Sequence, residues 1–90
     1  MGNIFNGALI SAAGALEDVT IGCEVGYAKV VNVTTNIVYE YIGGVVMATA
    51  GATGVITQAS DVLVVDSNGF TIAAAALSAD DVVVYTAVRK

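Results

Sequence analysis

Short runs of β-branched and aromatic residues recur along the chain from Val19 onward, and residues that favour turns separate each run from the next. Such runs are typical of β-strands, because branched and aromatic side chains pack well on a pleated surface. They recur about every 8 to 12 residues, with no long helical pattern between them. The sequence therefore predicts an all-β fold, a small antiparallel β-sandwich or barrel, and leaves the strand topology open.

Two hairpins are predicted from local sequence. The stronger joins residues 62–65 to residues 70–72 through Asp66-Ser67-Asn68-Gly69, because Asn-Gly supplies the positive φ angles of a tight turn. The second joins residues 27–33 to residues 37–42 through Thr34-Thr35-Asn36, since Asn tolerates positive φ. Further strands are expected at residues 19–21, 45–49 and 82–88.

Residues 1–16 differ from the rest of the chain, because they are rich in Gly, Ala and Asn. Phe5 and Leu9 follow helical spacing, but Gly7 and Gly14 each weaken a helix by about 1 kcal/mol. Two interpretations stay open: a frayed terminus, or an arm that becomes ordered on a neighbouring subunit. We therefore divide the chain into an N-terminal arm, residues 1–16, and a β domain, residues 17–90.

The apolar composition predicts association. The chain has 90 residues, of which 57% are hydrophobic and 12% are charged. Domains of this size often need disulfides, a metal ion or association for stability, and one Cys with no His leaves association. We expect a homo-oligomer, a trimer or similar ring, and a folded monomer at micromolar concentration in a sedimentation experiment would contradict this expectation.

The hydrophobic pattern also raises the question of what covers the sheet. Residues 62–65 and 82–84 are apolar without alternation, so these strands either lie between two layers or meet another chain on their outer face. Tyr39 and Tyr41 share one face of a strand, as an interface pair or as ordinary half-buried sheet residues. Together with apolar groups of the arm, they complete the candidate partner contacts: Ile4, Phe5, Leu9, Ile10, Tyr39 and Tyr41.

Composition argues against several classes of function. Without His, no serine or cysteine has the usual general base, so we expect no catalytic residues and no enzyme. The spacing of the acidic residues fits no calcium loop, so we expect no metal and no cofactor. A net charge of −5 also argues against nucleic acid as a partner.

A membrane-spanning segment is a further alternative, because no charge occurs between Glu40 and Asp61. Gly, Thr, Gln and Ser residues dilute its hydropathy, so the expectation is no membrane. A small membrane-embedded coat protein with a helix over residues 41–60 stays as an alternative. Because no basic residue precedes Lys29, we expect no secretory signal.

Three stretches between residue 27 and the end of the chain resemble a known class of protein. The stretch YAKVVNVTTNIVYEY at residues 27–41, then NGFTI at 68–72 and the final VYTAV strand, resembles small virion structural proteins of tailed bacteriophages. The resemblance covers residues 27–89 and leaves residues 1–16 unmatched. It implies a head decoration or cement protein that binds the outer surface of the capsid and carries no catalytic residues.

The resemblance also implies partners and a location. The partners are the lattice of the major capsid protein and further copies of the chain. The location is the capsid surface of the virion, with the host cytoplasm during assembly. A head-to-tail connector or tail subunit is the alternative within the same class. The low side-chain entropy of Gly, Ala, Val and Thr suits a module repeated many times in a rigid lattice.

Overall fold

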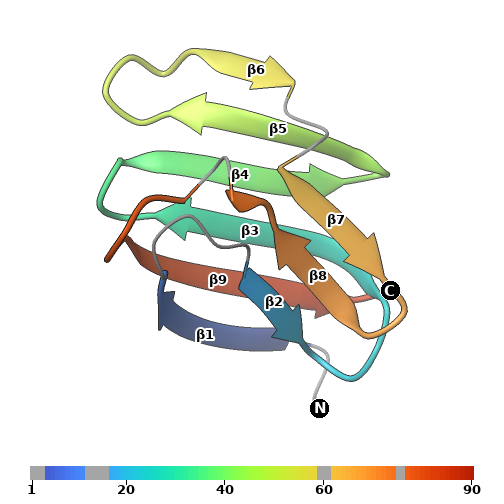
Figure 1. Cartoon of the computed structure of the whole chain (residues 1–90). Helices are drawn as coiled ribbons and strands as arrows, with labels where there is room; N and C mark the ends of the chain where they lie inside the picture. The colour runs from blue at the N-terminus through green and yellow to red at the C-terminus, as the bar shows by residue number, and fades with distance from the viewer. Residues whose placement is uncertain (1–3, 12–16, 59–61, 75–76) are drawn as a thin grey trace.

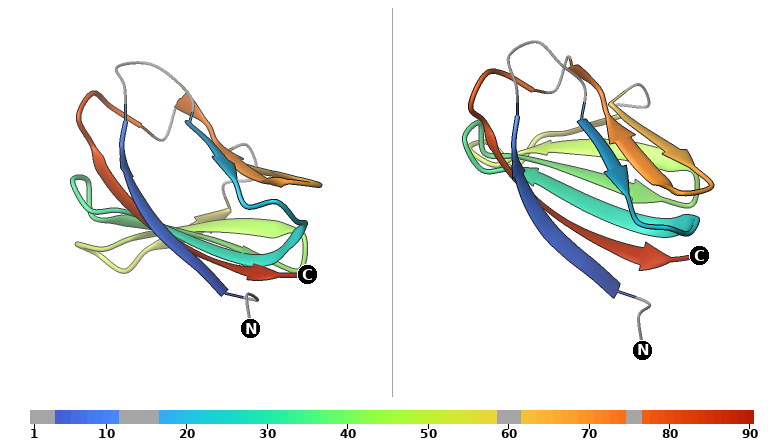
Figure 2. Two further views of the ribbon diagram at one scale, coloured as in Figure 1. Left: turned by 90° about the horizontal axis from the view of Figure 1, so that it is seen from below. Right: turned by 60° about the horizontal axis from the view of Figure 1, so that its bottom comes forward.

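Two antiparallel sheets form the fold in this computed structural model, which describes residues 4–11, 17–58, 62–74 and 77–90 (Figure 1). The larger sheet has six strands in the order β1-β9-β3-β4-β5-β6, and the smaller has three in the order β2-β8-β7. Figure 2 shows the two sheets as separate layers, so the all-β sandwich expected from the sequence is confirmed. The strands are β1 (Ile4–Ile10), β2 (Glu17–Thr20), β3 (Val25–Asn32), β4 (Ile37–Ile42), β5 (Val45–Ala50), β6 (Ile56–Gln58), β7 (Leu63–Asp66), β8 (Gly69–Ile72) and β9 (Val82–Arg89).

Both predicted hairpins are confirmed. β3 pairs with β4 from Tyr27↔Ile42 to Asn32↔Ile37, and Asn36 in the connecting turn has a φ of 59°. β7 pairs with β8 from Leu63↔Ile72 to Asp66↔Gly69. Local turn chemistry therefore fixes both pairings.

The turn between β7 and β8 works differently from the prediction. The positive φ lies at Gly69, with a value of 150°, where β8 begins. The turn residues Ser67 and Asn68 precede it, and the backbone N–H of Asn68 donates to Asp66 Oδ1 over 2.8 Å. An Asx turn therefore stabilises this hairpin. Gly69, which has no side chain, allows β2 to approach β8 closely.

Residues 4–10, predicted as part of an arm, form strand β1 in the larger sheet. They pair with β9 from Ile4↔Val88 to Ile10↔Val82. The helical spacing of Phe5 and Leu9 is not followed, because pairing with a distant strand decides the conformation. The remaining arm residues, 1–3 and 12–16, lie outside the described residues, and contact of the arm with a neighbouring subunit stays a prediction.

The segment considered for a membrane helix contains strands. The end of β4, all of β5 and all of β6 occupy residues 41–58, while 59–60 lie outside the described residues. β5 had been predicted, and β6 had not. Among the residues that the structure describes, no helix has the length and apolar character needed to cross a membrane.

The core lies between the two sheets. Phe70 at its centre is fully buried and packs edge-on against Tyr85, with ring centroids 5.6 Å apart. Burial of such side chains contributes roughly 1.5–3 kcal/mol each. The sheets supply the other buried hydrophobic residues, with Leu77 from the connection before β9: Val19, Val25, Ala28, Val30, Tyr39, Val46, Leu63, Ile72, Val83 and Ala87.

The structure excludes one explanation of the missing alternation, burial between two layers, and contact with another chain stays a prediction. In β9, Val83 is fully buried, whereas Val82 and Val84 are 42% and 38% exposed. In β7, Leu63 is buried and Val64 is 57% exposed. These strands therefore have one covered face and one apolar face that no second layer of the described chain covers.

A buried polar cluster joins three segments that are far apart in the sequence. Asp81 Oδ2 accepts hydrogen bonds from Asn32 Nδ2 over 2.8 Å and from the backbone N–H of Ser78 over 2.9 Å. The Ser11 hydroxyl donates to the carbonyl of Ser78 and accepts from the Asp81 N–H. The cluster therefore connects the end of β1, the end of β3 and the approach to β9.

We expect the fold to lose stability in alkali through Tyr39. Burial, and then the negative charge of Asp81, raise the pKa of Tyr39 above 10.0. The neutral phenol is the form that the fold favours, so this contribution is complete below about pH 10 and is lost as the pH rises through the folded-state pKa. The urea midpoint should fall above about pH 10, and Tyr39→Phe should reduce that fall. An unchanged pH dependence in this variant would contradict the assignment.

Candidate functional site

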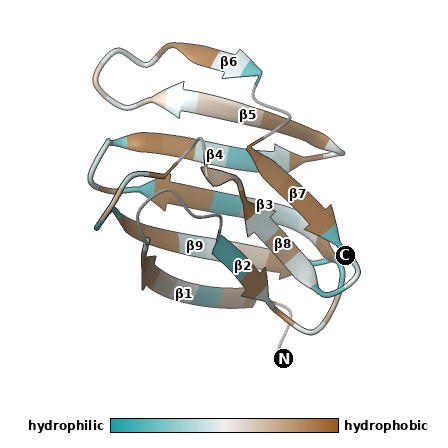
Figure 3. Ribbon diagram, viewed as in Figure 1, coloured by the Kyte–Doolittle hydropathy of each residue, from teal (hydrophilic) through white to brown (hydrophobic). Residues whose placement is uncertain are grey.

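The outer faces of the two sheets differ in chemistry. On the smaller sheet, the Thr71 hydroxyl donates to Asp18 Oδ1 over 3.1 Å, and Val64 is the exposed apolar exception. On the larger sheet, exposed apolar residues occur on strands at both edges and at the centre. Figure 3 shows hydrophobic residues along these strands. We call this second surface the open face, formed by Ile4, Asn6, Ala8, Ile10, Tyr27, Lys29, Val31, Val38, Glu40, Ile42, Val45, Met47, Thr49, Ile56, Gln58, Val82, Val84, Thr86 and Val88.

Register aligns the open face into rows that run across the strands. One apolar row crosses five strands: Ile4, Val88, Tyr27, Ile42 and Val45. A second, mostly apolar row crosses all six: Ala8, Val84, Val31, Val38, Thr49 and Ile56. Because neighbouring strands lie about 4.8 Å apart, each row forms a continuous strip.

A polar row lies between the two apolar rows. Lys29 and Glu40 are paired across β3 and β4, and they are the charged residues among the outward-pointing strand positions of the open face. The hydroxyl of Tyr27 donates to Glu40 Oε2 over 3.0 Å. Partial burial and then this bond raise the pKa of Tyr27. The open face therefore combines broad apolar area with one cation and one anion at its centre.

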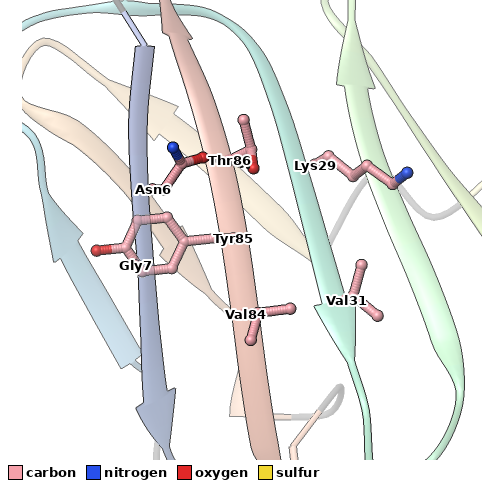
Figure 4. A pocket seen from close by; sticks show the side chains of 7 residues that line it. All are labelled: Asn6, Gly7, Lys29, Val31, Val84, Tyr85 and Thr86. Carbon is pink, nitrogen blue, oxygen red and sulfur yellow. Dashed lines mark hydrogen bonds between the residues drawn. The ribbon is translucent and has the colours of Figure 1, made fainter. Parts of the chain in front are cut away.

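A shallow depression of about 350 Å³ lies on the β1, β9 and β3 side of this face (Figure 4). Its lining includes Lys29 and the pair Asn6 and Thr86, whose side chains are hydrogen-bonded over 2.8 Å. Figure 4 shows the ring of Tyr85 lying across β1 beside Gly7. The described lining contains no His, Cys, Asp or Glu residue.

The structure separates the residues predicted as partner contacts. Ile4 and Ile10 are 62% and 67% exposed on β1 and belong to the open face. Phe5 and Leu9 point to the other side of the same strand and are half-buried. The two tyrosines, predicted to share a face, do so: Tyr39 is 7% exposed within the core and Tyr41 packs against it.

Sequence reasoning did not select the other exposed residues of the open face. The missing alternation at residues 82–84 pointed to two of them, Val82 and Val84, and it had two explanations. The missed set consists of Ile42, Val45, Ile56, Val82 and Val84. A two-residue period drawn across β4 and β5 would have placed Ile42 and Val45 on one face, because their hairpin pairs them directly.

In the described part of the chain, no group of three or more His, Cys, Asp or Glu residues could hold a metal ion. Cys23 is a thiol outside any disulfide and is half-buried. The open face is therefore the strongest candidate site on the described residues. Comparisons with protein-family models, with curated proteins and with solved structures found no match.

Proposed function

We propose that this chain is a non-enzymatic virion structural protein that binds the outer surface of a tailed-phage capsid and stabilises it. The observation that carries the proposal is the open face, an apolar sheet surface that the second sheet leaves uncovered. Exposed apolar surfaces of this breadth mark interaction sites in soluble proteins. The phage assignment rests on the resemblance of residues 27–41, residues 68–72 and the final VYTAV strand to small virion structural proteins of tailed bacteriophages, some of which decorate the head.

The size of the open face suits a lattice partner. Six strands spaced about 4.8 Å apart, with about six residues of 3.4 Å each, give a flat area of roughly 600 Å². This approaches the ~800 Å² that each partner contributes to a standard interface. A single contact of this kind is of moderate strength, and many copies on one shell gain avidity.

The function test compares two lysine substitutions at equal exposure. Ile42 lies on the open face and Val64 on the outer face of the smaller sheet, and both are 57% exposed. We expect Ile42→Lys to weaken binding to capsid shells about tenfold or more, because a charge would be desolvated in an apolar contact, and Val64→Lys to leave it unchanged. The measurement is co-sedimentation with shells of the phage's major capsid protein, assembled without this chain.

Two further readouts complete the test. Wild-type protein should raise the melting temperature of the shells, since a ligand that binds the assembled form stabilises it. Equal binding by the Ile42→Lys and Val64→Lys variants would exclude the open face as the binding surface. Absence of binding by the wild type would exclude the capsid as the partner. Copy number in the virion, from gel densitometry, distinguishes many decoration subunits from the single ring of a connector.

A further inference from the structure

Strand β1 is an edge without the usual protection against pairing. In the described chain it has β9 on one side and no strand on the other, and Figure 2 shows it at the rim of the larger sheet. Natural edges are commonly short, charged, bulged or interrupted by Pro. β1 has 7 residues, Ile-Phe-Asn-Gly-Ala-Leu-Ile, with neither charge nor Pro.

Two hydrogen bonds establish which backbone groups face this edge. The Ser11 N–H donates to the carbonyl of Asp81 in the register that continues the β1–β9 pairs. The Val33 N–H donates to the carbonyl of Val82, so the even-numbered residues of β9 bond to β3. Bonded and non-bonded pairs alternate in antiparallel sheets. The odd-numbered residues of β1 therefore bond to β9, and four residues direct their N–H and C=O groups to the open edge: Ile4, Asn6, Ala8 and Ile10.

The sequence of β1 is self-complementary about Gly7. In an antiparallel pair of copies centred there, Ile4 lies opposite Ile10, Asn6 opposite Ala8, and Phe5 opposite Leu9. Each of the four residues whose backbone groups face the open edge then lies opposite another such residue of the second copy and exchanges two hydrogen bonds with it. Ile10 and Ile4, the two most exposed large hydrophobic residues among those described, are thereby paired with each other.

Gly7 lies at the centre of such a pair, and the Tyr85 ring of its own chain covers it. A Cβ atom at this position would overlap the Tyr85 ring, which crosses β1 at this point (Figure 4). In this register the two-fold axis lies between the Gly7 residues of the two copies, and each copy covers its own Gly7 with the Tyr85 ring. Aromatic cover of an edge glycine stabilises the strand that presents it.

Charges at the two ends of β1 favour the antiparallel orientation. Arg89 follows the residue paired with Ile4, whereas Asp80 donates its N–H to the carbonyl of Ser11, just beyond Ile10. In an antiparallel pair, the Arg89 end of one copy and the Asp80 end of the other lie at the same end of the joined strands, three strand spacings or about 14 Å apart. This attraction is long-range and is strongest at low salt.

We propose that two copies of this chain pair through β1, antiparallel about a two-fold axis at Gly7, to form one continuous sheet. A closed two-fold pairing uses the same strand from both copies and leaves no second β1 edge for further growth. The two open faces then lie on the same side of the joined sheet. We expect this dimer for the isolated protein, independently of the capsid proposal. It differs from the trimer or ring expected from composition.

The first test is the mass of the isolated protein by sedimentation equilibrium. We expect a monomer–dimer equilibrium between 9.0 kDa and twice that mass. Ala8→Pro should shift it to monomer by at least about tenfold in dissociation constant, because Pro removes an N–H directed at the partner while the bonds to β9 remain. Circular dichroism and thermal melting should show that the variant is folded.

The second test is a charge exchange that only this register rescues. Ile4→Lys and Ile10→Glu should each weaken the dimer by about tenfold, and the double variant should regain most of the affinity, because position 4 of one copy faces position 10 of the other. Val64→Lys, on the smaller sheet, is the control and should leave the dimer intact. A monomer at every concentration, a trimer, open-ended growth, a dimer that tolerates Ala8→Pro, or failure of the double variant to recover would each overturn the proposal.

Discussion

Replacing Asp81 with alanine is expected to lower the free energy of unfolding by about 3 kcal/mol. The Asp81 side chain accepts hydrogen bonds from Asn32 Nδ2 and from the Ser78 N–H, and both Asp81 and Asn32 are almost fully buried. Alanine would leave both donors without this acceptor in a site that water does not reach. Because small domains have about 5–15 kcal/mol of total stability, this loss is large.

The neighbouring acidic residue provides a matched control. Asp80 is exposed and has a φ of 63°, a conformation that Asn also tolerates. Asp80→Asn should change stability by less than about 0.5 kcal/mol, whereas Asp81→Asn should cost about 1–2 kcal/mol. Urea unfolding followed by circular dichroism measures both. If Asp81→Ala proves no more costly than Asp80→Asn, the buried cluster does not hold the three segments together.

The hairpins were predictable from the sequence because their information is local. Asn36 between β3 and β4, and Asp66 with Gly69 between β7 and β8, lie within a few residues of the pairs they establish. The reason given for the second turn was incomplete. Gly69 has its positive φ where β8 meets β2, and this neighbour comes from a segment about fifty residues earlier in the chain.

Strand β1 and the polar cluster could not be predicted, because their partners are distant in the sequence. β1 pairs with β9 at the opposite end of the chain, and its own residues had weak helical spacing. Asn32 is read from the sequence as an ordinary strand residue, and its role depends on Asp81. Long-range pairing of this kind leaves no local pattern to read.

The open face was predictable in part. The unbroken apolar run at residues 82–84 indicated that both faces of β9 are apolar, and Ile4 and Ile10 were named as contacts. Whether the outer side is covered depends on which side of the larger sheet the second sheet lies, and this is not readable from a local pattern. That sheet has three strands over the inner side of a six-stranded sheet, and the outer side of β9 stays exposed.

Gly69→Ala is expected to be the most disruptive single-methyl change in the described chain, at about 4 kcal/mol or more. A Cβ atom at Gly69 would overlap the carbonyl oxygen of Val19 and lie 3.0 Å from the backbone nitrogen of Ile21. Both neighbours belong to the backbone, so no side chain can rotate away. The Ile21 N–H also donates to the carbonyl of Asn68 over 2.7 Å, so a shift of β2 would break this bond. The smaller sheet, which covers the core, would lose its central contact.

A second glycine separates this overlap from backbone strain. Gly54 has a φ of 72°, and a Cβ atom there would meet nothing within 4 Å. Gly54→Ala should therefore lower the free energy of unfolding by only about 1 kcal/mol, the cost of holding Ala in the left-handed conformation. The difference of about 3 kcal/mol between the two variants in urea unfolding measures the close approach of β2 to β8 together with the difference in backbone strain between the two φ values. Equal losses would mean that β2 can move away from β8 at little cost to the core.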